Sequence, residues 1–182
     1  MNKGMAPRIY DPRIIAIDLR FRRSGFATFE GSRKLLDFGT IHLGQLRNGG
    51  SKFSDLLKLS LPSTIVVKQE RWRNLMARSD SSILIEALTA QAKAHSTKIR
   101  LLEQNTLESI FGRGTKAEIS ASLALIFPEL AWELPPKRRI WEPEHSRQTV
   151  FDAIALGLAF LQSEMNMIEA PAEPPEIEEG SI

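Results

Sequence analysis

The stretch RIIAIDLRFRRSGFATFEG, residues 13–31, begins with an apolar run that ends on an aspartate and continues into three arginines. Residues 14–17 and Leu19 would make both faces of one strand apolar, which is typical of a central strand. Asp18 lies at or near the C-terminal end of that strand. Because an ionised carboxylate is costly in such surroundings unless it is paired or bound to a metal ion, Asp18 needs a partner. That partner is either one of the following arginines or a cation that the chain itself does not supply.

The rest of the chain predicts an α/β fold. Further strands are expected at 25–30, 35–43, 63–70 and 98–104, and residues 47–51 are expected to form a loop. Helices are expected shortly before Pro62, over 81–95, after Thr115 and over 146–162; Thr115 and Glu118 have capping-box spacing. This order predicts a mixed five-stranded sheet, three antiparallel strands followed by two parallel ones, flanked by helices.

Composition is that of a soluble globular protein, with 42% apolar and 25% charged residues in 182. We expect one domain over 13–163, preceded by an N-terminal extension, 1–12. No apolar run is long enough to cross a membrane and no signal peptide is visible, so the sequence favours a cytoplasmic protein. The absence of cysteine excludes disulfides and thiolate zinc sites, so any metal ion would need oxygen or histidine ligands.

Charge is distributed unevenly along the chain. Residues 164–182 contain six acids and no Lys or Arg, and the remainder contains 24 basic and 16 acidic residues. This pattern predicts a basic folded domain followed by an acidic, disordered tail. Such a domain would suit a polyanion, although an ordinary solvated surface explains the charge equally well.

Three carboxylates stand in unusual sequence positions. Asp18 and Glu70 are expected at strand ends, and Asp152 precedes eight residues without a polar side chain. Each has an alternative explanation: an ion pair with a nearby arginine for the first two, and a capping box with Thr149 for Asp152. Carboxylates that converge on one cleft repel one another, and divalent cations remove that repulsion. Two Mg²⁺ ions bound by oxygen ligands can activate water for phosphodiester hydrolysis.

Four segments resemble the RuvC-type Holliday junction resolvases of the RNase H-like superfamily. They are IIAIDLRFRRSGFATFEG, IVVKQE, FGRGTKAEI and FDAIALGLAF, and together they span residues 13–162. The resemblance implies an RNase H-like fold with Asp18, Glu70 and Asp152 as catalytic metal ligands for two Mg²⁺ ions, with Mn²⁺ as a substitute. The family usually has a fourth ligand one helical turn before the last aspartate, where this sequence has Thr149. His145 or Glu144 would then have to replace it.

Basic and aromatic residues flank the expected site. Arginine suits phosphates, glycines allow close backbone approach, a helix N-terminus offers free N–H groups, and tryptophan can stack on an unpaired base. A well-capped helix without a ligand is the alternative for the glycine loop. The candidate nucleic-acid-binding residues are Arg20, Arg22, Arg23, Arg71, Trp72, Arg73, Arg113, Gly114, Lys116, Lys137, Arg138 and Arg139.

The sequence therefore predicts a Mg²⁺-dependent, structure-selective endonuclease that cleaves Holliday junctions or other branched DNA by attack of a metal-activated water. Alternatives are a RuvC-like protein that binds branched nucleic acid with weak or no cleavage, and an RNase H-like nuclease for RNA–DNA hybrids. We expect neither a membrane association nor an organic cofactor. A homodimer would match the two-fold symmetry of a junction. Its interface is expected on helix 81–95, at Ile83, Leu84, Ala87 and Leu88, although these residues would serve equally well in the core.

Overall fold

A five-stranded mixed sheet forms the centre of the molecule. The structure is a computed structural model and describes residues 12–31, 33–43, 49–77, 79–136, 139 and 141–169. The strands are β1 (Arg13–Asp18), β2 (Arg23–Glu30), β3 (Lys34–His42), β4 (Thr64–Lys68) and β5 (Lys98–Leu102), in the order β3-β2-β1-β4-β5. β1 to β3 pair antiparallel, and β4 and β5 join in parallel, which confirms the predicted sheet.

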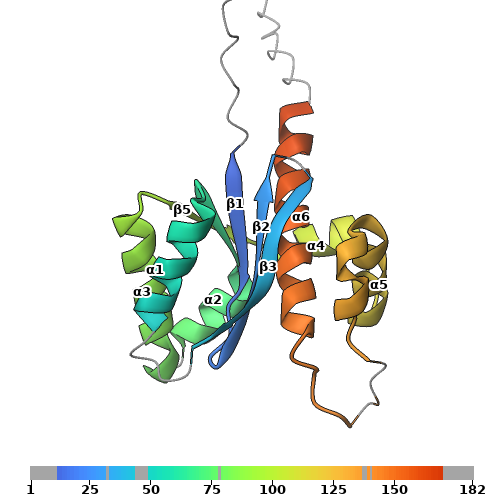
Figure 1. Cartoon of the computed structure of the whole chain (residues 1–182), viewed down its shortest axis with the longest axis horizontal. Helices are drawn as coiled ribbons and strands as arrows, with labels where there is room; N and C mark the ends of the chain where they lie inside the picture. The colour runs from blue at the N-terminus through green and yellow to red at the C-terminus, as the bar shows by residue number, and fades with distance from the viewer. Residues whose placement is uncertain are drawn as a thin grey trace, which may run out of the picture.

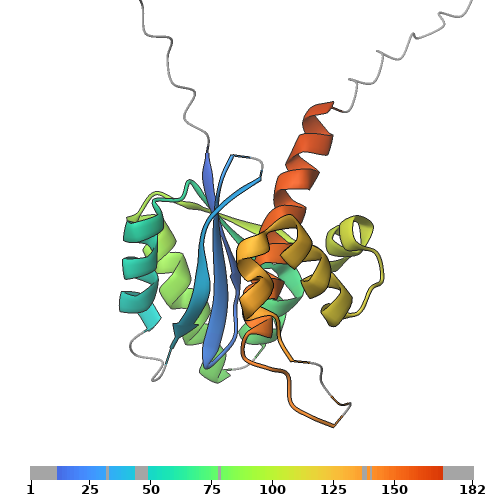
Figure 2. The same ribbon diagram turned by 45° about the vertical axis from the view of Figure 1, so that its right-hand side comes forward.

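Helices cover both faces of this sheet. They are α1 (Gly49–Ser60), α2 (Gln69–Met76), α3 (Ser79–Ala94), α4 (Gln104–Phe111), α5 (Lys116–Ile126) and α6 (Gln148–Glu169), with the 3₁₀ helix η2 (Pro128–Glu133). Figure 1 and Figure 2 show α1 and α3 on one face and α6 on the other, with α4 and α5 beyond α6. The sheet is therefore the middle layer of three.

Strand periodicity produces two hydrophobic cores. Successive side chains of a strand point to opposite faces, so Ile14 and Ala16 of β1 pack under α6, whereas Ile15 and Ile17 pack under α1 and α3. The helix at 146–162 was predicted as apolar, and α6 is buried along most of its length. Its apolar residues form most of the first core.

Two glycines allow α6 to lie close to the sheet. A Cβ atom on Gly25 of β2 would lie 1.9 Å from the main-chain oxygen of Thr149, and one on Gly157 of α6 would lie 2.4 Å from Cε2 of Phe29. Both distances are far below a normal contact, so a larger residue at either position would force neighbouring atoms to move. The first contact fixes the start of α6 against β2.

Several predicted boundaries were wrong. β4 ends at Lys68 rather than at residue 70, and the sequence pattern missed α2 and α4 entirely. Residues 49–51 of the predicted loop begin α1, because Phe53, Leu56 and Leu57 bury its apolar face. α6 continues to Glu169, so residues 164–169 of the predicted tail are helical. Residues 1–11 and 170–182, which include most of the predicted extension and tail, lie outside the described residues.

The predicted dimer face is mostly part of the core. Leu84 and Leu88 of α3 are fully buried in the core of this single chain, Ala87 packs on the same cluster, and of these four residues only Ile83 is exposed, at 44%. The core alternative therefore applies to Leu84 and Leu88.

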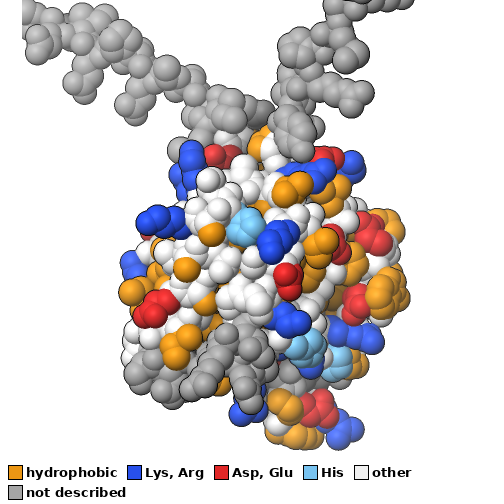
Figure 3. Space-filling view, turned by 60° about the vertical axis from the view of Figure 1, so that its left-hand side comes forward, with side chains coloured by type: hydrophobic (Ala, Val, Ile, Leu, Met, Phe, Trp, Pro, Cys, Tyr) orange, Lys and Arg blue, Asp and Glu red, His pale blue; other side chains and the backbone are white. Residues whose placement is uncertain are grey.

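Figure 3 shows acidic, basic and hydrophobic side chains interspersed on one face of the molecule, without one large basic patch there. Within the described ranges, no helix combines the length and apolar character needed to cross a membrane.

Candidate functional site

The alternation of β1 carries Asp18 to the face that α6 covers. Ile14 and Ala16 point to this face, so Asp18, two residues further on, points there too. The side chain is 5% exposed. The sequence therefore buries a carboxylate at the end of a central strand, as its apolar neighbours predicted.

Helix α6 brings Asp152 to the same end of the sheet. Figure 1 shows α6 antiparallel to β1, so the first turns of the helix lie where the strand ends. Asp18 pairs in register with Gly25, the residue on which the main chain of Thr149 rests. Asp152 lies one helical turn beyond Thr149. This packing places two carboxylates near each other although their positions in the sequence are 134 apart.

Arg20 lies between three carboxylates. Its Nε donates to Oδ2 of Asp18 at 2.6 Å, its Nη1 to Oε2 of Glu144 at 2.6 Å, and its Nη2 to Oδ2 of Asp152 at 2.7 Å. The ion pair that the sequence offered as the alternative for Asp18 is therefore present, and it includes Asp152 as well. Glu144 comes from the loop before α6 and completes the set.

Two further side chains hold Asp152. Lys116, the first residue of α5, donates to Oδ2 of Asp152 at 2.9 Å and also to Oε1 of Glu144. Gln148, one turn earlier on α6, donates to Oδ1 of Asp152 at 3.0 Å. The predicted capping box at Thr115 and Glu118 is present and fixes the start of α5, which positions Lys116. Both oxygens of Asp152 thus have partners.

Burial and charge shift the pKa values of two of these acids in opposite directions. Burial raises the pKa of Asp18 above its ordinary value; Arg20 opposes this and the nearby charge of Asp152 adds to it. Burial also acts against ionised Glu144, but hydrogen bonds from Lys116 and Arg20 outweigh it, and the pKa of Glu144 is lowered. The site therefore contains a buried carboxylate that repels its neighbour and depends on cations for compensation.

Glu70 occupies a different environment. It lies in the first turn of α2, two residues beyond β4, so its predicted position at a strand end was wrong. Its side chain is 61% exposed and pairs with Lys68 at 3.3 Å. Among the described contacts, none joins Glu70 to Asp18 or Asp152. The simple surface pair that the sequence left open is present, although with Lys68 rather than with an arginine.

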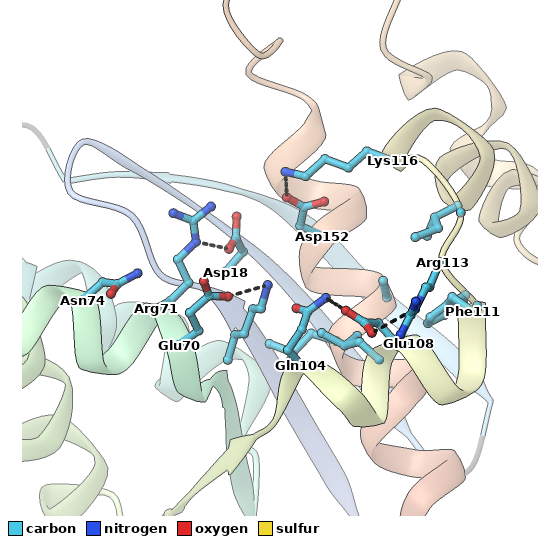
Figure 4. A pocket seen from close by; sticks show the side chains of 17 residues that line it. Asp18, Glu70, Arg71, Asn74, Gln104, Glu108, Phe111, Arg113, Lys116 and Asp152 are labelled. Carbon is cyan, nitrogen blue, oxygen red and sulfur yellow. Dashed lines mark hydrogen bonds and ion pairs between the residues drawn. The ribbon is translucent and has the colours of Figure 1, made fainter.

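Asp18, Glu70 and Asp152 all line one cleft of about 630 Å³. Figure 4 shows Asp18, Glu70 and Asp152 reaching it from β1, α2 and α6, with Arg71 and Lys116 beside them. The glycine loop forms another wall through Gly112, Arg113 and Gly114, and Gly112 has a φ of 70°, which favours glycine. Carboxylates and cations of the predicted site thus line one hollow.

Other predicted residues lie elsewhere. Trp72 packs against the core beneath α1 and α3, so it does not face the cleft, and Arg73 lines a neighbouring polar hollow. Arg22, Arg23 and Arg139 do not line the cleft. The exposed His145 accepts a hydrogen bond at Nδ1 from the amide of Arg147. Lys137 and Arg138 lie outside the described residues.

Sequence reasoning missed three residues of the site. Gln148 could have been found from its spacing, because side chains four residues apart share a helix face and Asp152 was already a candidate. Lys68 and Gln104 lie at or just beyond the carboxyl ends of the parallel strands β4 and β5, which meet at one edge of the sheet. Any polar residue there was a candidate for the cleft.

The donor atoms suit a divalent cation, but their present arrangement suits a guanidinium. Three carboxylate oxygens converge on Arg20, and magnesium prefers oxygen ligands of this type. A guanidinium is wider than a metal ion, so its carboxylate partners stand further apart than the ligands of one ion. Within the residues that the structure describes, no three Asp, Glu or His side chains are already arranged to hold a metal.

Comparisons with known proteins agree on the fold. No protein-family model matches the chain, and no curated protein matches it in sequence. Among solved structures, Thermus thermophilus RuvC in complex with a Holliday junction substrate has a TM-score of 0.61 at 13% identity, over 85% of this chain and 96% of that one. Fowlpox virus resolvase in complex with Holliday junction DNA has a TM-score of 0.54 at 13% identity, over 84% and 99%.

The yeast mitochondrial Holliday junction resolvase has a TM-score of 0.50 at 15% identity, over 89% of this chain and 85% of that one. Identities this low establish the shared fold and nothing further. The predicted resemblance is confirmed at that level. This chain has the RNase H-like fold found in the RuvC-type Holliday junction resolvases.

Proposed function

We propose that this protein is a divalent-metal-dependent endonuclease that cleaves branched DNA, with four-way junctions as its substrate. One observation carries the proposal: Asp18 from β1 and Asp152 from α6 meet at the edge of a cleft that cationic side chains also line. The solved structures of similar fold include two complexes with Holliday junction DNA, which supports a branched substrate.

The metal ligands in this proposal are Asp18, Asp152 and Glu70, with Glu144 in place of the fourth ligand that Thr149 does not provide. Thr149 is buried, and its hydroxyl donates to the carbonyl of Ser146. Glu144 shares both Arg20 and Lys116 with Asp152, whereas His145 is exposed, so Glu144 is the better candidate. When bound, two Mg²⁺ ions, or Mn²⁺ in their place, would supply an activated water and charge stabilisation at the phosphate.

The protein's own residues perform the remaining tasks. Lys116 at the start of α5, together with Arg71 and Arg113, presents positive charge to a phosphate backbone, and Gly114 allows the backbone of the loop to come close. Buried Asp18 fixes one ligand rigidly because β1 is held between β2 and β4. Arg113 is 93% exposed, and its one described ion pair is a long contact of 3.9 Å between its Nε and Oε2 of Glu108, so a phosphate can compete for its side chain.

Assembly as a homodimer would give one site for each of two opposed strands of a junction. The exposed Ile83 leaves part of α3 accessible for such an interface, but buried Leu84 and Leu88 do not contribute to it. Sedimentation equilibrium of the protein, alone and with a junction, would measure the subunit number; a monomer in both conditions would contradict this part of the proposal.

The test of function is cleavage of an end-labelled four-way junction in Mg²⁺ and in EDTA. We expect symmetric nicks in Mg²⁺, none in EDTA, and at least a hundredfold slower cleavage for Asp18→Asn, in line with the loss of an electrostatic contributor to catalysis. Asp55→Asn makes the same chemical change on the exposed side of α1, across the sheet from the cleft, and should cleave normally. Tight junction binding without cleavage in Mg²⁺ or Mn²⁺ would contradict the nuclease proposal. Faster cleavage of an RNA–DNA hybrid would contradict the choice of substrate.

A further inference from the structure

Arg20 is the feature of the site that a metal-binding role does not require. Each of three nitrogens of its guanidinium binds a different carboxylate, from β1, the loop before α6, and α6 itself. The side chain is 21% exposed. Asp18, Asp152 and Glu144, three of the four acids to which the proposed function assigns metal binding, are thus already bound to one internal cation.

Charge compensation at this cluster is complete without a metal ion. Asp18, Asp152 and Glu144 contribute three negative charges. Arg20 and Lys116 contact them at hydrogen-bond distance, and Arg71 lies 3.8 Å from Oδ1 of Asp18. A free divalent cation would meet a neutral cluster rather than an anionic one, and its charge would repel the guanidinium.

We propose that Arg20 competes with divalent cations for these carboxylates, and that a backbone phosphate of the DNA substrate is the ligand that draws Arg20 away. The inference rests on the proposed function and adds an order to it: metal binds well only after nucleic acid has entered. Guanidinium binds phosphate with two parallel hydrogen bonds, so a phosphate can replace carboxylate partners. The side chain of Lys116 is half-exposed, and a phosphate can replace its carboxylate partners Glu144 and Asp152 in the same way.

Binding of Mn²⁺ to the free protein tests the first half of the proposal without any cleavage. Free Mn²⁺ is measured by electron paramagnetic resonance in titrations of the wild type, Arg20→Gln and Arg22→Gln. We expect about tenfold tighter Mn²⁺ binding for Arg20→Gln, a change typical of coupled sites. Arg22→Gln removes the same charge from an exposed position outside the cleft and should leave the affinity within about twofold of the wild type.

A second substitution tests whether the increase in Mn²⁺ affinity depends on Asp18. In the double variant Arg20→Gln with Asp18→Asn, the extra Mn²⁺ affinity should disappear, because one of the freed ligands is lost. Circular dichroism melting checks that the variants fold. If Arg20→Gln is too unstable, Lys116→Gln serves instead, with a smaller expected gain because Lys116 contacts two carboxylates rather than three.

The effect of Ca²⁺ on junction affinity, measured by fluorescence anisotropy, tests the second half. Metal and DNA must strengthen each other by the same factor, so Ca²⁺ should tighten junction binding by the wild type more than by Arg20→Gln. If Ca²⁺ tightens junction binding equally in the wild type and in Arg20→Gln, the proposal that a DNA phosphate draws Arg20 away would be overturned. Equal or weaker Mn²⁺ binding by Arg20→Gln would overturn the competition, even if the wild type cleaves junctions. If the protein does not cleave junctions, and if Asp18→Asn leaves the affinity for Mn²⁺ unchanged, the proposed metal site itself would be overturned.

Discussion

Asp18 and Glu70 look alike in the sequence and differ in the folded protein. Each comes within three residues after an apolar run and has an arginine one or two residues further on. In the structure Asp18 is 5% exposed and shares Arg20 with acids from two other segments, whereas Glu70 is 61% exposed and pairs only with its neighbour Lys68 among the described ion pairs. The two carboxylates therefore enter the cleft with different rigidity and different local charge.

The difference comes from what covers each strand end. α6 packs across β1 and β2, so the residue at the end of β1 is enclosed by a helix that is distant in sequence. β4 ends at Lys68, and the chain turns directly into α2, which leaves Glu70 on the rim. The environment of a carboxylate at a strand end is thus decided by a helix elsewhere in the chain.

The substitution Gly25→Ala should break this enclosure and is expected to have the largest effect. Its Cβ atom would lie 1.9 Å from the carbonyl oxygen of Thr149, a main-chain atom that cannot rotate away. We expect a loss of about 3 kcal/mol in the free energy of unfolding, as for severe overpacking. Urea unfolding followed by circular dichroism measures it.

The matched control for this prediction is Gly50→Ala in α1. There the nearest atom to a new Cβ is Nε2 of Gln91, at 3.8 Å, so the same change meets no obstacle. Alanine favours helix more than glycine does, and we expect a gain of about 0.5–1 kcal/mol. A loss for Gly25→Ala below about 1 kcal/mol would mean that α6 can shift from β2 without cost, and the enclosure of Asp18 would need another explanation.

A pH series sharpens the comparison at Asp18 itself. Burial raises the pKa of Asp18 above 3.8, so the folded chain holds this proton more tightly than the unfolded chain. The stability that Asp18 contributes is therefore complete below its ordinary pKa and is lost as pH rises through the raised value. The free energy of unfolding of Asp18→Asn, measured in EDTA against the wild type, should improve relative to the wild type as pH rises from 3 to 7. A difference that stays constant or declines would contradict the raised pKa.

Much of the fold was predictable because it follows from local patterns. The apolar run at 14–17 predicted a central strand, and the spacing of Thr115 and Glu118 predicted the start of α5; both predictions are confirmed. The helices α2 and α4 were missed, since each is eight residues long and follows a strand without a capping side chain. Short helices of this kind depend on tertiary packing rather than on local signals.

The site was predictable only in its residue types. Asp18, Asp152 and Lys116 were recognisable as candidates, but the contact of Arg20 with both aspartates, and that of Lys116 with Asp152, required the position of α6 on the sheet. The sequence offered Arg20 both as a phosphate contact and, like Arg22 and Arg23, as an ion-pair partner for Asp18, because three closely spaced arginines give no indication of which one turns inward. The choice is made by tertiary packing, because α6 and the loop before it bring Asp152 and Glu144 to the guanidinium of Arg20.

The smallest expected change in stability belongs to Glu70→Gln, which tests the other half of the comparison. Its exposed ion pair with Lys68 is of a kind that contributes little, so the free energy of unfolding should change by less than about 0.5 kcal/mol. Junction cleavage in Mg²⁺ should nevertheless slow at least tenfold, because the proposed function makes this acid a metal ligand. Glu86→Gln, on the exposed side of α3, is the control for both measurements. Unchanged cleavage by Glu70→Gln would remove Glu70 from the metal site, and the acids that Arg20 joins would then have to hold the metal without it.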